Sequence, residues 1–187
     1  MRITGGEHRG RLLRTPSTTL RPTQDRVRAA AFSILAARVP GAAVLDLFAG
    51  SGAYGIEALS RGAASADFLD ADPRSAAAIR RNLSDLRIPA SAARVRVGDV
   101  FRLLRNPPPA PFDLVFADPP YAEAAANGWL PRLAALLLEN HWLSPDSFFL
   151  FETDAPTPAP LPGLTLLLDR TYGATRLLLF RPAPPPP

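Results

Sequence analysis

The sequence contains no cysteine and no lysine, and it has no apolar run close to the ~20 residues that a membrane-spanning helix needs. The absence of cysteine excludes disulfide bonds, thiolate metal sites and cysteine nucleophiles. The two histidines, His8 and His141, have no partners at metal-ligand spacing, so we expect no bound metal. With 187 residues and no signal peptide, the chain is expected to be a monomeric, single-domain cytoplasmic protein without membrane contact.

The 21 basic residues are therefore all arginine, and they are unevenly distributed. The first 40 residues hold eight arginines and only two acidic residues, whereas the remainder holds 13 arginines and 15 acidic residues. Compositional bias explains a preference for arginine over lysine, but it does not explain this separation of charge. A basic segment ahead of a slightly acidic body favours contact with nucleic acid.

Short apolar strands alternate with helical segments through the middle of the chain. This order predicts a Rossmann-like α/β fold with a mostly parallel seven-stranded sheet. Two closing strands without a helix between them predict an antiparallel edge strand. The expected strands are 44–48, 67–70, 94–97, 113–117, 148–152, 164–168 and 176–180, and the main helices are 52–61, 73–86 and 128–139.

The single domain is expected to cover residues 1–181. Residues 1–21 form a basic arm with a short N-terminal β-hairpin, built from Arg2–Thr4 and Arg11–Leu13. Residues 22–181 form the α/β core, and its first helix follows Thr23, a suitable capping residue. Residues 182–187 are almost all proline and are expected to be a disordered tail.

A glycine-rich loop joins the first core strand to its helix. Gly50 to Gly55 match G-x-G-x-x-G, a pattern that lets the backbone approach a ligand and that also fits NAD. Asp46, at the end of the strand, would repel a pyrophosphate but could hold a cation. Asp70 ends the second strand, where it can accept hydrogen bonds from ribose hydroxyls. Asp99 could accept from an adenine amino group, and Val100 could donate its backbone N–H.

Asp46-Leu47-Phe48-Ala49-Gly50-Ser51-Gly52 resembles the S-adenosylmethionine loop of class I methyltransferases. The resemblance implies S-adenosylmethionine as cofactor, with this loop around its methionine end. It also implies contact of Asp70 with the ribose and of Asp99 with the adenine. The implied cofactor-binding residues are Asp46, Phe48, Ala49, Gly50, Ser51, Gly52, Asp70, Asp99 and Val100.

The motif Asp118-Pro119-Pro120-Tyr121 follows the fourth core strand. Each proline lacks an N–H and disfavours a helical residue before it, so the turn is held extended. The Asp118 carboxylate and the nearby carbonyls can then accept from the exocyclic NH₂ of a base, and Tyr121 can stack on a flipped base. The motif resembles the [DNS]-PP-[YFW] signature of amino-group N-methyltransferases that act on adenine, guanine or glutamine. It predicts Asp118, Pro119, Pro120 and Tyr121 as catalytic residues.

Further motifs resemble one bacterial family, which methylates N2 of a guanine in 16S ribosomal RNA. They include Ile3-Thr4-Gly5-Gly6, Arg21-Pro22-Thr23 and Glu57-Ala58-Leu59-Ser60-Arg61-Gly62-Ala63. The resemblance runs from about Ile3 to Arg181. Tyr54 departs from it, standing where the family often has leucine, and so does Asp70, where the family often has glutamate.

The family resemblance implies methyl transfer from S-adenosylmethionine to guanine N2, on 16S rRNA within a 30S subunit or its assembly intermediate. Three alternatives stay open: an adenine-N6 DNA methyltransferase, a small-molecule or protein methyltransferase, and an NAD-dependent oxidoreductase. The oxidoreductase would have no use for Asp118–Tyr121, and the small-molecule enzyme would not need the basic arm. The implied RNA-binding residues are Arg2, Arg9, Arg11, Arg14, Arg21 and Thr23.

Overall fold

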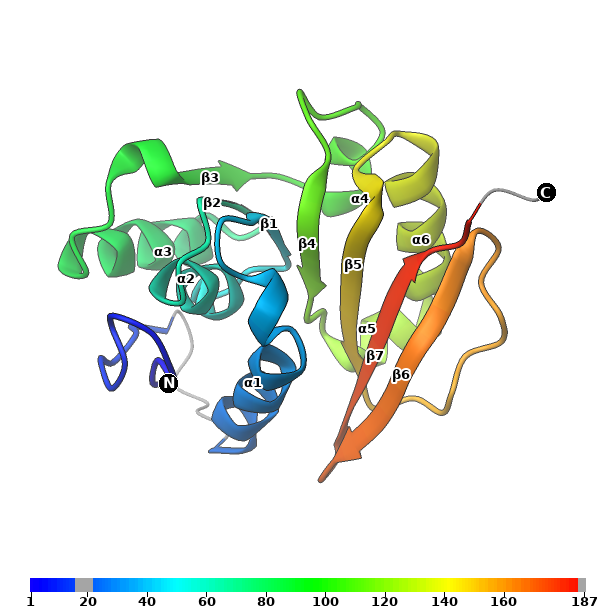
Figure 1. Cartoon of the computed structure of the whole chain (residues 1–187), viewed down its shortest axis with the longest axis horizontal. Helices are drawn as coiled ribbons and strands as arrows, with labels where there is room; N and C mark the ends of the chain where they lie inside the picture. The colour runs from blue at the N-terminus through cyan, green and yellow to red at the C-terminus, as the bar shows by residue number, and fades with distance from the viewer. Residues whose placement is uncertain (16–21, 185–187) are drawn as a thin grey trace.

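The computed structural model of the chain describes residues 1–15 and 22–184, without the side chains of residues 22–24. In this described part, seven strands form one sheet in the order β3-β2-β1-β4-β5-β7-β6 (Figure 1). The strands are β1 (Ala43–Leu47), β2 (Ser65–Asp70), β3 (Ala93–Val97), β4 (Phe112–Ala117), β5 (Leu143–Thr153), β6 (Leu164–Tyr172) and β7 (Thr175–Pro182).

The expected fold class is confirmed, with one refinement at the closing edge. Strands β3, β2, β1, β4 and β5 pair in parallel, and β7 runs antiparallel to both of its neighbours. The antiparallel strand therefore lies one position inside the edge, because β7 is inserted between β5 and β6. Pro182 still pairs with Leu164, and the Ala183 N–H donates to the Gly163 carbonyl at 2.8 Å. Order thus extends into the expected tail, whose last residues, 185–187, lie outside the described chain.

Helices cover both faces of the sheet, as the near-continuous apolar runs of its central strands require. Val44 belongs to one buried cluster with residues of α1, α2 and α3, whereas Leu45 belongs to a second with residues of α4 and α6. The Asp72 carboxylate caps α3 by accepting the Arg74 N–H at 2.9 Å, with Pro73 as the first helical residue, as predicted. The helices are α1 (Pro22–Ile34), α2 (Ala53–Ser60), α3 (Pro73–Asp85), α4 (Val100–Leu103), α5 (Tyr121–Ala126) and α6 (Trp129–Glu139).

The basic arm is a docked hairpin rather than an extension into solvent. Arg2 and Leu12 form an antiparallel bridge, and the Ile3 N–H donates to the Arg11 carbonyl at 3.0 Å. Ile3 and Leu13 are both buried in the cluster that contains α2. The arm therefore contributes apolar side chains to the core and keeps its arginines exposed.

Within the described residues, none of the helices combines the length and the apolar character needed to cross a bilayer. No group of three or more His, Cys, Asp or Glu side chains in that part of the chain could hold a metal ion.

Candidate active site

The register of the parallel strands brings four loops to one edge of the sheet. Leu47 at the end of β1 pairs with Leu69 of β2 and with Ala117 at the end of β4. The chain moves from β1 toward β3 on one side and continues with β4 and β5 on the other. The edge beyond β1 and β4 is therefore the topological switch point, where open α/β sheets bind their ligands.

The loop after β1 is held by Asp70. Its Oδ2 accepts the Gly50 N–H at 2.7 Å, and its Oδ1 accepts the Asp72 N–H at 2.8 Å. Asp70 thus fixes the glycine loop as well as standing at the end of β2. Because a carboxylate has about four lone-pair positions, acceptor capacity remains for a ligand hydroxyl.

The three glycines of the motif have different surroundings. A Cβ on Gly55 would lie 2.3 Å from the Phe68 ring, and one on Gly52 would lie 3.1 Å from Ile79. A Cβ on Gly50, by contrast, would meet only the Phe48 carbonyl oxygen, at 4.0 Å. Gly55 and Gly52 therefore allow α2 to pack closely on β2, whereas Gly50 (φ 53°) leaves open space beside the loop. That opening, next to Asp70, fits the adenosyl cofactor expected there.

Asp46 lies below the loop, with only 3% of its surface exposed. Its Oδ2 accepts the Gly55 N–H at 2.9 Å. Burial raises the pKa of Asp46 to about 8, against the lowering effect of the Gly55 hydrogen bond. In the ligand-free protein this carboxyl is therefore mostly protonated at neutral pH, which differs from the ionised group expected from the sequence. A cationic ligand beside it would favour ionisation.

Asp99 and Val100 begin α4 at the end of β3. Asp99 is exposed and caps α4, because its Oδ1 accepts the Arg102 N–H at 2.7 Å. Val100 is the first residue of α4, where a backbone N–H has no carbonyl partner within the helix. Both groups lie at the same sheet edge as Asp70, since Val97 pairs with Asp70.

The Asp118–Tyr121 motif leads directly from β4 into α5. Pro119 is buried, Asp118 is half-buried, and Pro120 (φ −57°, ψ 113°) precedes the first helical residue, Tyr121. The Tyr121 hydroxyl donates to Glu152 Oε2 at 3.1 Å and lies 3.1 Å from Thr175 Oγ1. The tyrosine ring is thus tethered at its far end by β5 and β7.

Glu152 is a site residue that the sequence interpretation missed. It is buried at the carboxyl end of β5, and its Oε1 accepts a very short hydrogen bond from the Tyr54 hydroxyl. Burial raises the pKa of Glu152, although both phenols lower it by hydrogen bonding. Burial, followed by the charge of Glu152, also raises the pKa of Tyr54 and of Tyr121. Both phenols therefore stay neutral donors. The available signal was an acidic residue ending a buried strand beside β4.

An aromatic cluster borders the loop on its other side. Phe48 (φ 57°) stacks on Trp129 with ring centroids 5.1 Å apart, and Phe101 lies against both. Ala49 is buried, and the Ser51 carbonyl accepts from the Asn82 side chain at 3.0 Å. The cluster and the Asn82 contact fix the conformation of the loop from two sides.

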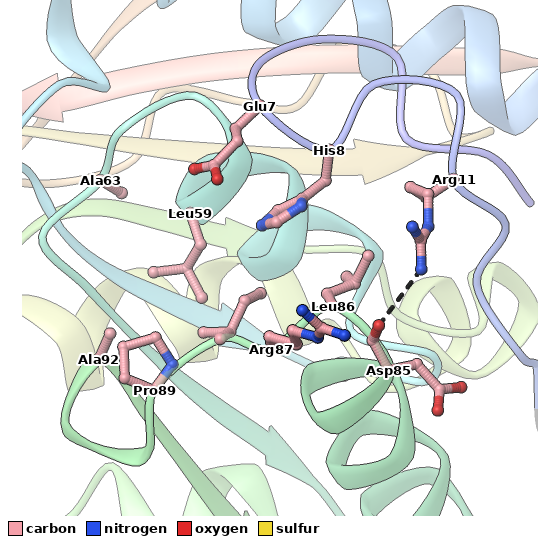
Figure 2. Close-up of a pocket in the computed structure, with 11 residues that line it drawn as sticks. Glu7, His8, Arg11, Leu59, Ala63, Asp85, Leu86, Arg87, Pro89 and Ala92 are labelled. Atoms are coloured by element: carbon pink, nitrogen blue, oxygen red, sulfur yellow. Dashed lines mark hydrogen bonds between the residues drawn. The ribbon is translucent and has the colours of Figure 1, made fainter.

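The predicted RNA-binding residues are only partly within the described structure. Arg2, Arg9, Arg11 and Arg14 are all exposed on the docked arm. Arg21 and the side chain of Thr23 lie outside the described part of the structure. The backbone of Thr23 belongs to α1, so Thr23 does not precede the helix as the capping prediction required. Beside the arm lies a cavity of about 690 Å³, bordered by His8, Arg11 and Arg87 (Figure 2).

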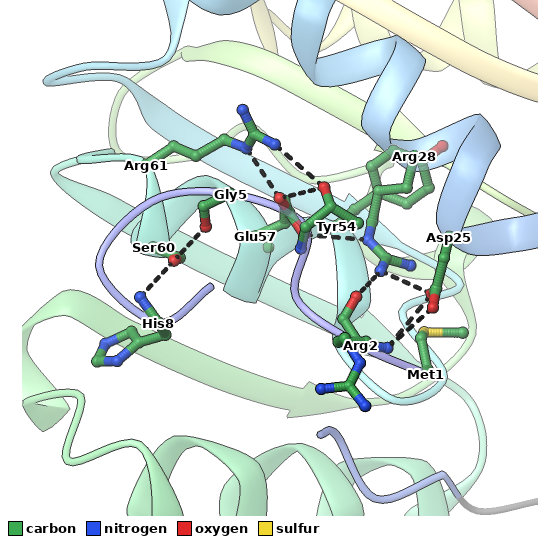
Figure 3. Close-up of polar contacts among 12 residues, drawn as sticks. Met1, Arg2, Gly5, His8, Asp25, Arg28, Tyr54, Glu57, Ser60 and Arg61 are labelled. Atoms are coloured by element: carbon green, nitrogen blue, oxygen red, sulfur yellow. Dashed lines mark hydrogen bonds and ion pairs between the residues drawn. The ribbon is translucent and has the colours of Figure 1, made fainter. Parts of the chain in front are cut away.

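A buried ionic network attaches the arm to α1 and α2 (Figure 3). Glu57 is fully buried and accepts the Thr4 N–H at 2.8 Å, Arg61 Nε at 2.8 Å and Arg28 Nε at 3.3 Å. Arg28 is 2% exposed and also donates to the Arg2 carbonyl and to Asp25. The sequence did not predict the ion pair between Arg28 and Glu57, because these residues are 29 positions apart.

Comparisons with known proteins identify the family of this chain. The family model described as "Conserved hypothetical protein 95" matches residues 1–181. Ribosomal RNA small subunit methyltransferase D of Haemophilus influenzae is 37% identical over 97% of this chain and 93% of its own. The same-named protein of Escherichia coli K12 is 39% identical over 86% of this chain and 78% of its own. The chain belongs to this family.

Structural similarity to solved methyltransferases extends over nearly the whole chain. The solved structure of the Escherichia coli protein yhhF superposes with a TM-score of 0.84 at 36% identity, over 97% of both chains. The Haemophilus influenzae methylase HI0767 gives a TM-score of 0.80 at 34% identity, also over 97% of both chains. The expected enzyme class is thereby confirmed: the protein is an S-adenosylmethionine-dependent methyltransferase.

Proposed function

We propose that this protein transfers a methyl group from S-adenosylmethionine to the exocyclic N2 amino group of one guanine in 16S rRNA, leaving S-adenosylhomocysteine while the amine releases one proton. The observation that carries the proposal is the pairing of Leu47 with Ala117. Because these residues end β1 and β4, the glycine loop and the Asp118 motif start side by side at the switch point. A methyl donor and an acceptor amine held by these two segments would be neighbours.

The Asp118 motif suits an aromatic amine as acceptor. Such a nitrogen is a poor nucleophile, because its lone pair is delocalised into the ring. The Asp118 carboxylate and the Pro119 carbonyl accept its two N–H groups and favour a pyramidal nitrogen, whose lone pair then faces the methyl donor. Tyr121, tethered through Glu152 and Thr175, supplies a ring for stacking on the flipped base.

The cofactor is held by the residues that surround the opening at Gly50. Asp46 and the Phe48–Gly52 loop take the methionine end, Asp70 the ribose, and Asp99 with the Val100 N–H the adenine. When bound, the cofactor supplies an electrophilic sulfonium methyl group. The chain's own task is to orient the two reactants and to exclude water from between them.

The rRNA substrate is supported by the relatives from Haemophilus influenzae and Escherichia coli, whose name specifies small-subunit rRNA. The exposed arginines of the arm contact RNA phosphates, and so do Arg21 and Thr23, which come after the arm in the chain. We further propose that the single domain of residues 1–181 acts as a cytoplasmic monomer. Its substrate is a 30S subunit or an assembly intermediate, because so small a protein can read little of a large RNA alone.

Mass mapping of 16S rRNA from cells with and without the gene tests this proposal. In cells without the gene, we expect one N2-methylguanine to be lost. The wild-type gene should restore it, whereas a gene that carries Asp118→Ala should not. An unchanged rRNA modification pattern would refute the rRNA function. Methylation of purified 30S subunits and of naked 16S rRNA, compared in vitro, distinguishes the two forms of substrate. Transfer to adenine N6 in DNA would instead support the alternative enzyme.

A further inference from the structure

The cavity beside the arm has the size and the lining of a ligand site (Figure 2). Its volume of about 690 Å³ lies within the range of pockets that bind small molecules. Apolar side chains such as Leu59, Leu86 and Ile88 line it together with the basic groups of His8, Arg11 and Arg87. Apolar side chains beside charged ones can accommodate the base and the phosphate of a nucleotide, respectively.

The cavity is separate from the proposed methyl-transfer site. Leu59 lies in the last turn of α2, whereas the glycine loop precedes the first turn of that helix. An eight-residue helix is about 12 Å long, so the cavity is roughly that distance from the cofactor loop. The cavity therefore cannot be the site of either the cofactor or the target base.

Arg87 occupies a backbone position that favours glycine. It follows α3 with φ 57°, its N–H donates to the Ser84 carbonyl, and the Ile88 N–H donates to the Leu83 carbonyl. This is a Schellman motif, whose left-handed residue is usually glycine because a side chain there is strained. The chain instead has an arginine that lines the cavity. A strained residue with a charged side chain at a pocket is a sign of function.

In the part of the chain that the structure describes, the two guanidinium groups at the cavity have no carboxylate partner. Arg11 donates to the Asp85 backbone carbonyl at 3.3 Å, and the Asp85 carboxylate pairs with Arg14 instead. Among the described residues, no carboxylate lies within 4.0 Å of a nitrogen of Arg11 or Arg87, although the acidic residues Glu7 and Asp85 also line the cavity. Both arginines can therefore bind an anionic ligand such as a phosphate.

The arm connects the cavity to the methyl-transfer site along α2. At one end, Met1 Sδ lies 3.4 Å from Ser51 Oγ in the glycine loop. At the other end, the His8 N–H donates to Ser60 Oγ at 2.9 Å. Arg2 and Arg9 are exposed on the same segment. A strand of RNA that follows the arm would leave the active site and pass these two guanidinium groups before it reaches the cavity.

We infer that the cavity binds a second nucleotide of the RNA substrate, several positions from the methylated guanine. Arg11 and Arg87 bind its phosphate, while its base packs on the apolar lining beside the His8 imidazole. This inference rests on the proposed function, since it requires an RNA substrate. The cavity would be a second recognition site on the protein. It would favour RNA in which a second nucleotide lies at the right distance from the methylated guanine.

Arg87→Gly is the most informative variant, because it removes the guanidinium while relieving the backbone. Its Tm should be at or above that of the wild type, yet its Kd for 30S subunits or 16S rRNA should rise roughly fivefold. The slope of log K against log salt should become shallower by about 0.7 for the loss of one phosphate contact. Arg11→Gln should act in the same direction. The matched control is Arg170→Gln, an exposed arginine on β6 at the opposite edge of the sheet.

The two histidines allow a direct test of occupancy. We would titrate the full-length protein with a uridine hexanucleotide, which has no guanine for the methyl-transfer site, and follow both imidazole signals by NMR. The His8 signal should shift, and the shift should be lost in Arg87→Gly, whereas the signal of His141, two residues after α6, should stay unchanged.

The inference is overturned if the His8 signal does not move, or if Arg87→Gly binds RNA as tightly as Arg170→Gln does. These outcomes leave the proposed function intact as long as the wild type methylates rRNA. If the wild type does not methylate rRNA at all, the proposed function itself fails.

Discussion

The Tyr121 hydroxyl donates a hydrogen bond to Glu152 Oε2 at 3.1 Å, which links the end of the proline motif to the end of β5. The other oxygen of Glu152 accepts from Tyr54, the second residue of α2. One buried carboxylate therefore ties the proposed base-binding tyrosine to the helix that follows the cofactor loop. This arrangement makes Glu152 a positioning residue for Tyr121.

Glu152→Gln tests that role. A glutamine keeps the volume, but only its carbonyl oxygen can accept, so its NH₂ group faces one of the two phenols. We expect kcat to fall about tenfold, as the loss of one hydrogen bond to a charged group predicts, with little change in KM for S-adenosylmethionine. Steady-state methylation assays measure both constants.

Thr175→Val is the matched control, because it removes only the second partner of the Tyr121 hydroxyl. Its kcat should fall less than that of Glu152→Gln. An unchanged kcat in Glu152→Gln would show that Tyr121 does not depend on this tether.

Asp46→Asn should change how stability depends on pH. The pKa of Asp46 is about 8 in the folded protein and near 3.8 when unfolded, so between these values only the folded state keeps the proton. Wild-type stability therefore falls as pH rises through this window, and the asparagine variant lacks that loss. At pH 7, about three pH units above the unfolded pKa, the variant should be more stable by about 4 kcal/mol, with the difference vanishing near pH 3. Urea denaturation at both pH values measures it, and a pH-independent difference would contradict the assignment.

Local patterns in the sequence predicted the parts of the fold that depend on near neighbours. The Asp72-Pro73 cap, the glycine loop and the alternation of strands and helices each involve residues close in the chain. The six-residue helix α5 was missed, because two prolines directly before Tyr121 favour an extended chain. The full length of β5 was also missed, since Pro145 and Asp146 interrupt its apolar pattern.

The missing parts of the site depend on contacts between distant residues. Tyr54 and Glu152 are 98 residues apart, and neither is unusual by itself. Tyr54 was recognised only as a departure from a common leucine, whereas in the structure it provides a hydrogen-bond donor for a buried acid. The arm was predicted as a short basic hairpin, but its docking against α1 and α2 was not predicted. Its docking depends on Arg28, whose burial no local pattern reveals.

Glu57→Ala should destabilise the protein strongly and release the arm. The change removes the Glu57 carboxylate from beside Arg28, which is only 2% exposed. It also breaks both hydrogen bonds that Thr4 donates to Glu57. Loss of one partner of a buried ion pair typically costs about 3 kcal/mol or more. Chemical denaturation measures this loss, and hydrogen exchange of the Ile3 and Thr4 amides reports the release of the arm.

Asp85→Ala provides the comparison, because Asp85 pairs with Arg14 of the same arm at the surface. Both of these side chains are more than half exposed, so the loss should stay below about 1 kcal/mol. Equal losses in the two variants would mean that burial does not determine how the arm is held.

Asp118→Ala separates chemistry from cofactor binding. The proposed role of Asp118 is to accept an N–H of the target amine as the nitrogen becomes pyramidal, so its interaction is strongest in the transition state. Turnover should fall at least about 100-fold, while the affinity for S-adenosylmethionine, measured by calorimetry, should change less than about twofold. Asp118→Asn keeps one acceptor oxygen and should retain more activity than the alanine variant. A loss of turnover explained entirely by weaker cofactor binding would assign Asp118 to the cofactor site instead of the target base.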